Sequence, residues 1–170
     1  MNSKLRIAGI VKESIVDGPG IRYVIFAQGC KHHCRGCHNP ETHSFEGGTL
    51  IEVDTILKEI ASNPLLDGIT LSGGEPFEQA EGFVGLAQEI KERNLHLMVY
   101  TGYTYEELLE KSRSHPSWGE LLELTDILVD GRFVIEKRDL RLVFKGSSNQ
   151  RIIDMNKTRL TGQLTLVEPT

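Results

Sequence analysis

Short apolar runs alternate with amphipathic helical stretches along most of this chain, and this order constrains the fold more than any other feature. Apolar runs that read as buried strands occupy residues 21–27, 68–71, 95–100, 127–130 and 140–145. Apolar residues recur at helical spacing over 53–60 and 83–90, and a third helix is expected over 105–111, where the segment 112–119 interrupts it. Strands that alternate with helices predict βα units on a parallel sheet.

The length of 170 residues limits how such a sheet can be completed. A full eight-stranded β/α barrel needs roughly 250 residues, so we expect a single α/β domain over residues 1–170 that forms an incomplete, partial parallel β/α barrel. The formal charge is −5 without a dense cluster of Lys and Arg, which disfavours nucleic-acid binding. Neither an export signal nor a membrane-spanning apolar run is visible, so a soluble protein of the reducing cytoplasm is expected.

Polar or glycine-rich segments follow four of the expected strands. They are the cysteine-containing loop after residue 27 and the segments 72–76, 101–104 and 130–132. Because loops at the carboxyl ends of parallel strands converge, these four segments are predicted to share one rim that carries the functional site.

The loop after the first of these strands contains every cysteine of the chain, in the pattern C-x3-C-x2-C. Three thiolates this close together require a compensating cation, so the loop predicts a metal centre. One alternative is a closed zinc site completed by a nearby histidine. The other is a 4Fe-4S cluster with one iron left open for a substrate, and the spacing alone does not choose between them. The cysteines are Cys30, Cys34 and Cys37, and the histidines are His32, His33, His38 and His43.

The cysteine loop, together with a Gly-Gly-Glu-Pro segment after the next expected strand, resembles the radical S-adenosylmethionine (SAM) superfamily. Five further blocks narrow the resemblance to the activating proteins of the anaerobic ribonucleoside-triphosphate reductase. These blocks are DGPGIR at 17–22, CHNP at 37–40, YTGY at 100–103, LVDG at 128–131 and GSSNQR at 146–151. They occur in order over most of the chain.

The resemblance implies a radical-generating enzyme. In the family it points to, three cysteines hold a 4Fe-4S cluster, and S-adenosyl-L-methionine binds to the fourth iron. Reductive cleavage gives a 5′-deoxyadenosyl radical, which removes a hydrogen atom from one glycine of the reductase. A low-potential donor such as flavodoxin or ferredoxin supplies the electron in this family.

The resemblance also implies roles for individual residues. Gly73, Gly74 and Glu75 match the motif that receives the methionine ammonium group, although the segment 72–76 also reads as an ordinary turn into a helix with Glu75 as a first-turn acid. Backbone groups of Gly36, Cys37 and His38 are expected at the adenine, with the aromatic wall of that site supplied elsewhere. Thr101, Asp130 and Arg132 are expected at the ribose and the methionine carboxylate, or else 130–133 is a simple turn with solvated charges. The segments 17–22 and 146–151 carry no assigned role.

Rival functions stay open on the sequence alone. Within the same chemistry, the chain also resembles the activase of pyruvate formate-lyase and the deazaguanine-forming ring-contraction enzyme. A zinc-stabilised binding module would use the cysteines and one histidine but would leave the Gly-Gly-Glu segment without a role. An electron carrier would normally hold its cluster with four cysteines.

Overall fold

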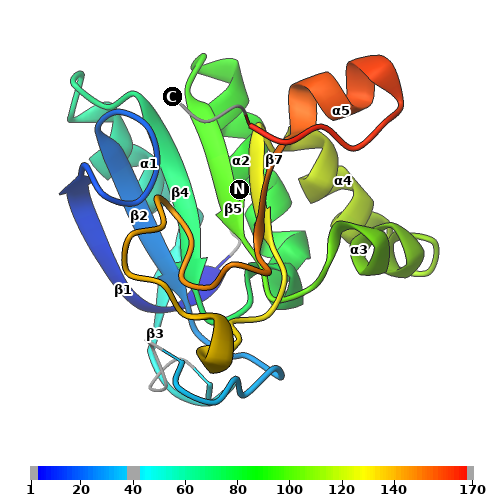
Figure 1. Ribbon diagram of the computed structural model, residues 1–170. Coiled ribbons are helices and arrows are strands. Elements are labelled where there is room, and N and C mark those ends of the chain that lie inside the picture. Colours follow the sequence, from blue (N-terminus) through cyan, green and yellow to red (C-terminus); the bar gives the residue numbers. More distant parts are fainter. Residues whose placement is uncertain (1–3, 38–42, 168–170) are drawn as a thin grey trace.

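The computed structural model describes residues 4–37 and 43–167, and within these residues seven strands form one mixed sheet (Figure 1). The strands lie in the order β3-β1-β2-β4-β5-β6-β7. Their bounds are β1 (Lys4–Ser14), β2 (Arg22–Ala27), β3 (Thr49–Glu52), β4 (Gly68–Gly73), β5 (His96–Tyr100), β6 (Ile127–Asp130) and β7 (Arg151–Asp154).

The centre of the sheet is parallel and its margins are antiparallel. β2, β4, β5 and β6 are the four expected strands at 21–27, 68–71, 95–100 and 127–130, and they pair in parallel as predicted. The strands β1, β3 and β7 were not predicted from the sequence. β1 runs antiparallel to both β2 and β3, and β7 runs antiparallel to β6. The expectation of a wholly parallel sheet is therefore wrong at both margins.

The strand predicted at 140–145 does not exist. Leu140 and Val143 are 82% and 65% exposed, and the segment forms turns instead. Its backbone has no sheet edge to join beside β6, because β5 and β7 occupy both sides of that strand. Phe144 then adopts a positive φ of 62°, which no extended strand residue shows.

Three helices lie where helical spacing predicted them, and two more were not foreseen. The confirmed helices are α1 (Val53–Ala61), α2 (Ala80–Glu92) and α3 (Tyr105–Ser112), and the others are α4 (Pro116–Leu124) and α5 (Met155–Thr161). The segment 112–119, read as an interruption of α3, contains the start of α4. Pro116 occupies the first turn of α4, where a proline costs no hydrogen bond and its fixed φ suits the helix.

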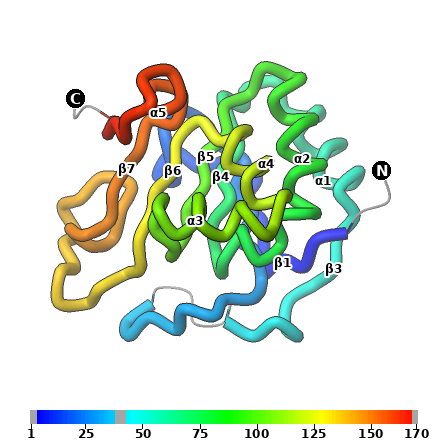
Figure 2. The backbone as a smooth tube through the Cα atoms, turned by 90° about the vertical axis from the view of Figure 1, so that its right-hand side faces the viewer, coloured from blue at the N-terminus to red at the C-terminus, as the bar shows by residue number. Residues whose placement is uncertain are grey.

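The two faces of the sheet differ in what covers them. Helices α1, α2 and α4 pack on one face, and the long connection between β6 and β7 passes over the other (Figures 1 and 2). Alternating side chains of β2 follow this division: Tyr23 and Ile25 join the core beneath the helices, while Phe26 lines a cavity on the opposite face. None of the described helices has the length and apolarity needed to cross a bilayer.

Candidate cofactor site

A cavity of about 490 Å³ lies on the face of the sheet opposite the helix-covered core, where Phe26 of β2 contributes to its lining. All four segments expected on a common rim contribute to its lining, which confirms that prediction. The segment after β2 contributes the three cysteines, and the other three contribute Ser72 to Gly74, Thr101 with Gly102, and Gly131. A cavity of this size accommodates an ordinary small cofactor.

All three cysteines line this one cavity. Cys30 is buried with 8% of its surface exposed, and Cys34 and Cys37 are partly exposed, so a ligand in the cavity can reach all of them. Backbone N–H groups of His32 and His33 donate hydrogen bonds to the sulfur of Cys30. Donors of this kind stabilise negative charge on a ligand sulfur.

Burial keeps two of the thiols protonated when no cation compensates them. Desolvation raises the pKa of Cys30 to about 11, and the carboxylate of Glu75 adds to this effect. Desolvation also raises the pKa of Cys34. Thiolate ligands here therefore require a strongly cationic centre that displaces the protons.

The donor set of the cavity fits an iron–sulfur cluster. Across residues 4–37 and 43–167, no three His, Cys, Asp or Glu side chains come together around a point that suits a single metal ion. A 4Fe-4S cube takes one thiolate per iron, so its three cysteines spread around the cube instead of meeting at one ion. The three cysteine side chains of the cavity satisfy this requirement in type and number.

The glycine pair after β4 brings its backbone directly against the end of β2. Gly74 N donates to Ala27 O (2.7 Å), and Glu75 N donates to Gly29 O (2.8 Å). Gly73 has a φ of +87°, and a Cβ on this residue would lie 2.6 Å from the backbone nitrogen of Ala27. Only glycine permits this approach, which fixes the segment after β4 against the strand that leads to the cysteines.

Glu75 lies behind the cavity wall. Its side chain is fully buried, and Oε1 accepts hydrogen bonds from Gly102 N (2.8 Å) and from His32 Nε2 (2.7 Å). Oε2 accepts from the Thr101 hydroxyl (2.8 Å) and from Phe77 N (3.2 Å). The carboxylate therefore joins the segments that follow β2, β4 and β5. Its direct contact with a bound ammonium group stays a prediction.

The other predicted cofactor residues lie in different surroundings. Thr101 lines the cavity and is 5% exposed. Asp130 is 1% exposed, but its carboxylate accepts hydrogen bonds from Arg151 and from Tyr105 N (2.8 Å), and it is not among the lining residues. Arg132 also lies outside the lining, with its side chain 47% exposed and 3.5 Å from Glu107.

The cysteine-loop residues predicted at the adenine are only partly described. Gly36 is exposed with a φ of +75° and is not a lining residue, whereas Cys37 lines the cavity. His38 lies outside the described residues. The cofactor roles of these residues stay predictions.

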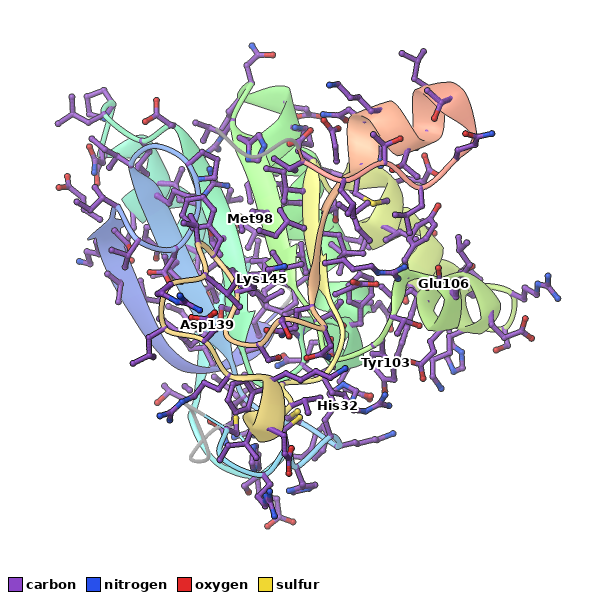
Figure 3. All side chains as sticks on the ribbon, in the orientation of Figure 1. His32, Met98, Tyr103, Glu106, Asp139 and Lys145 are labelled. Atoms are coloured by element: carbon purple, nitrogen blue, oxygen red, sulfur yellow. The ribbon has the colours of Figure 1, made fainter. Side chains whose placement is uncertain are left out.

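Several cavity residues carried no assignment from the sequence. Lys145 is the only Lys or Arg, and Asp17 the only carboxylate, among the described residues of the lining. Lys145 projects from the connection between β6 and β7 (Figure 3). Four aromatic side chains also face the cavity, namely Phe26, Tyr100, Phe133 and Phe144. Among these groups, Asp17 lies in the DGPGIR block and Tyr100 in the YTGY block, and Lys145 directly precedes the GSSNQR block.

Comparisons with known proteins agree with this geometry. Residues 16–153 match the family model described as a 4Fe-4S single cluster domain. The anaerobic ribonucleoside-triphosphate reductase-activating protein of Haemophilus influenzae is 34% identical over 81% of this chain and 90% of its own length. Its namesake from Vibrio cholerae is 35% identical over 81% and 90%, and that from Escherichia coli K12 is 34% identical over 80% and 90%.

Among solved structures, QueE from Escherichia coli aligns with a TM-score of 0.47 and 15% identity, over 59% of this chain and 53% of that one. The sequence identities to the activating proteins are more than twice as high, and the residues that match the family model include the cysteine loop, the glycine pair and the segments after β5 and β6. The chain belongs to the 4Fe-4S single cluster domain family and, within it, to the anaerobic ribonucleoside-triphosphate reductase-activating proteins.

Proposed function

We propose that this chain is a radical SAM activase, which installs a glycyl radical on an anaerobic ribonucleoside-triphosphate reductase. The observation that carries the proposal is the cavity that Cys30, Cys34 and Cys37 share with the glycine pair after β4. The relatives reported above carry the reductase in their names, which favours this partner over pyruvate formate-lyase or a small pterin-like substrate.

The three cysteines would hold a 4Fe-4S cluster, and S-adenosyl-L-methionine would occupy the rest of the cavity. When bound, the cluster supplies the electron that cleaves the sulfonium of SAM and so yields a 5′-deoxyadenosyl radical. The residues of the chain bind and orient SAM, and they exclude water from the cavity. The backbone of Gly73 and Gly74 faces the cavity and is the part of the motif that we assign to the methionine ammonium group.

The rest of the cavity suits the adenosyl part of the cofactor and the incoming glycine. We expect the adenine to pack against the aromatic side chains of the lining, which supply the wall that the sequence did not locate. Thr101 also lines this cavity, and its hydroxyl donates to Glu75 behind the wall. Glycine suits the reaction as a target because it brings no side chain into this space.

The sheet itself supports a finer structural proposal. Four parallel strands carry helices on one face and a cavity on the other, while β3 and β7 end the sheet without pairing to each other. We infer that this sheet is a partial β/α barrel of the radical SAM type. An unclosed barrel leaves the lateral room that a glycine on a large protein needs.

We infer the electron donor and the cellular location from the chemistry of the reaction, not from the fold. A low-potential flavodoxin or ferredoxin is the expected donor, because the reaction needs one electron at low potential. Three free cysteines suit a reducing compartment, so the cytoplasm remains the expected site of action.

Anaerobic reconstitution with iron and sulfide tests the assignment. The wild-type chain should bind a brown cluster, cleave SAM under a low-potential reductant, and give a glycine-centred doublet by electron paramagnetic resonance (EPR) when the reductase is present. Each of the variants Cys30→Ala, Cys34→Ala and Cys37→Ala should form no 5′-deoxyadenosine.

Three results would count against the proposal. A colourless protein with one tightly bound zinc supports the binding module instead. Cleavage of SAM without a doublet on the reductase points to another substrate, and a cluster without any cleavage points to an electron carrier.

A further inference from the structure

His32 sits at the junction of the cysteine loop and the buried carboxylate of Glu75, and neither the motif nor the family name assigns it a task. The residue lies between Cys30 and Cys34 in the sequence. Its side chain is 5% exposed, although its neighbour His33 is exposed. Figure 3 shows His32 beside Tyr103 at the end of the sheet, and their ring centroids lie 4.5 Å apart in an edge-on contact.

The ring of His32 is held from two sides. Nε2 lies 2.7 Å from Glu75 Oε1, and the carboxylate oxygen accepts, so Nε2 carries the proton. A Cβ on Gly102 would lie 2.4 Å from the ring, so the glycine of the segment after β5 leaves the space in which the ring rests. Tyr103 closes the other side. The imidazole therefore has one defined position instead of the freedom of a loop side chain.

The backbone of the same residue contacts a predicted cluster ligand. The N–H groups of His32 and His33 donate to the sulfur of Cys30. Hydrogen bonds to ligand sulfurs are among the factors that set the reduction potential of an iron–sulfur cluster. The position of the His32 backbone is thus linked to the cluster, and its side chain is linked to Glu75.

The side chain of Glu75 is itself held in place, since it accepts hydrogen bonds from four groups inside the protein. Besides His32, its partners are the Thr101 hydroxyl and the backbone N–H groups of Gly102 and Phe77. These groups belong to the segments after β4 and β5. A rotation of the His32 backbone would break a bond to a carboxylate that cannot follow it, and a buried carboxylate left short of donors is costly.

We propose that His32 is a positioning residue: anchored by Glu75, it holds the N–H groups of the cysteine loop on the sulfur of Cys30 and so sets the potential of the cluster. Glu75 acts in this scheme through His32, from behind the cavity wall. The inference rests on the cluster of the proposed function, and it adds a task that the motif does not specify.

Three variants separate this role from a general effect on the loop. His32→Leu removes the donor to Glu75. His32→Gln places an amide N–H near the position of Nε2 and should restore the bond. His33→Asn is the matched control, because it changes the adjacent exposed histidine and asparagine tolerates the positive φ of 48° at that position.

The measurements are the midpoint potential of the cluster, from EPR-monitored reductive titration of the reconstituted full chain, and the rate at which an iron chelator removes the cluster. Loss of N–H donors to sulfur disfavours the reduced, more negative cluster, so His32→Leu should lower the potential. It should also speed cluster loss about tenfold, as expected when one hydrogen bond is lost. His32→Gln and His33→Asn should both stay close to the wild type.

The outcomes distinguish this inference from the proposed function. A wild-type chain that takes up no cluster refutes the proposed function. A wild-type potential and loss rate in His32→Leu refute the positioning role alone, as does an equal change in His33→Asn. If His32→Leu does not fold, His32→Asn replaces it, since the shorter amide cannot reach Glu75, and the same two measurements decide.

Discussion

Arg22 Nη2 and His96 Nδ1 lie 3.0 Å apart inside the protein. A guanidinium can only donate, so Nδ1 accepts and the imidazole must be neutral. Arg22 is fully buried and also donates to Thr70 Oγ1 (2.7 Å) and to Pro19 O (2.8 Å). Through these hydrogen bonds, Arg22 connects His96 at the start of β5 to the turn that precedes β2.

The first prediction concerns the stability of the protein at low pH. Burial lowers the pKa of His96 below its ordinary value of 6.5, and the positive charge of Arg22 adds to this. Asp126, Lys91 and Asp154 have smaller effects of opposing sign. Below pH 6.5 the unfolded chain therefore binds more protons than the folded chain, and the free energy of unfolding falls as the pH falls, by at most about 1.4 kcal/mol per pH unit for this one group.

Urea denaturation between about pH 7.5 and 5.5 measures this slope. His96→Asn keeps an acceptor for Arg22 without a proton to gain, and it should flatten the pH dependence. His115→Gln, at an exposed position, serves as control and should keep the wild-type slope. An unchanged slope in His96→Asn would rule out His96 as its source.

The second prediction concerns the glycine pair. Gly73→Ala should lower the free energy of unfolding by about 2–4 kcal/mol, because it combines a positive φ with a contact of 2.6 Å to backbone that cannot move. Gly162→Ala is the matched control: Gly162 also has a positive φ, +73°, but a Cβ there meets nothing within 4 Å. It should cost only about 1 kcal/mol. Equal losses in the two variants would show that crowding against β2 contributes nothing.

The third prediction concerns Asp130, whose carboxylate is held by Arg151. Arg151 Nε lies 3.0 Å from Asp130 Oδ1, and the same guanidinium reaches Glu106 Oε1 at 2.6 Å. Arg151→Met should cost roughly 3 kcal/mol because it leaves a buried carboxylate uncompensated. Adding Asp130→Asn to that variant should recover most of the loss, as measured by urea denaturation.

Arg132→Met is the comparison for that pair. Arg132 meets Glu107 at 3.5 Å with both side chains well exposed, so its loss should change stability by less than about 1 kcal/mol. Its effect on SAM affinity tests the predicted contact with the methionine carboxylate. Full affinity in Arg132→Met would refute that contact.

The fourth prediction uses Trp118, the only tryptophan of the chain. Its ring lies 5.2 Å from that of Tyr103, which in turn contacts His32 of the cysteine loop. An iron–sulfur cluster absorbs where tryptophan emits, so cluster loading should quench most of the Trp118 fluorescence by energy transfer. Chelation should restore it. Cys30→Ala, treated in the same way, should show no quenching, and equal quenching there would mean that iron acts elsewhere.

The parallel centre of the fold and the common rim could be predicted from the sequence, because β2, β4, β5 and β6 are short apolar runs that end in glycine or polar residues. β1 and β3 escaped prediction since their outer faces are exposed, and β7 starts inside a polar block at Arg151. Apolar residues also predicted a strand wrongly at 140–145, because β5 and β7 already occupy both sides of β6.

The cysteines and the glycine pair of the site were evident from their spacing. The surroundings of Glu75 and Asp130 were not, because a carboxylate looks the same in a sequence whether it faces a ligand or a buried donor. Lys145 was equally hidden, and His32 was named only as a possible zinc ligand. Their importance depends on which segments the fold brings together, and these segments are separated by many residues along the chain.

The sheet ends at β3 on one side and at β7 on the other, so strands wall the cavity from one direction only and the connections between strands line the rest of it. A short-lived radical made in such a space has no sealed interior of its own. The client protein must complete the enclosure, and protection against oxygen and water then becomes a property of the assembled pair.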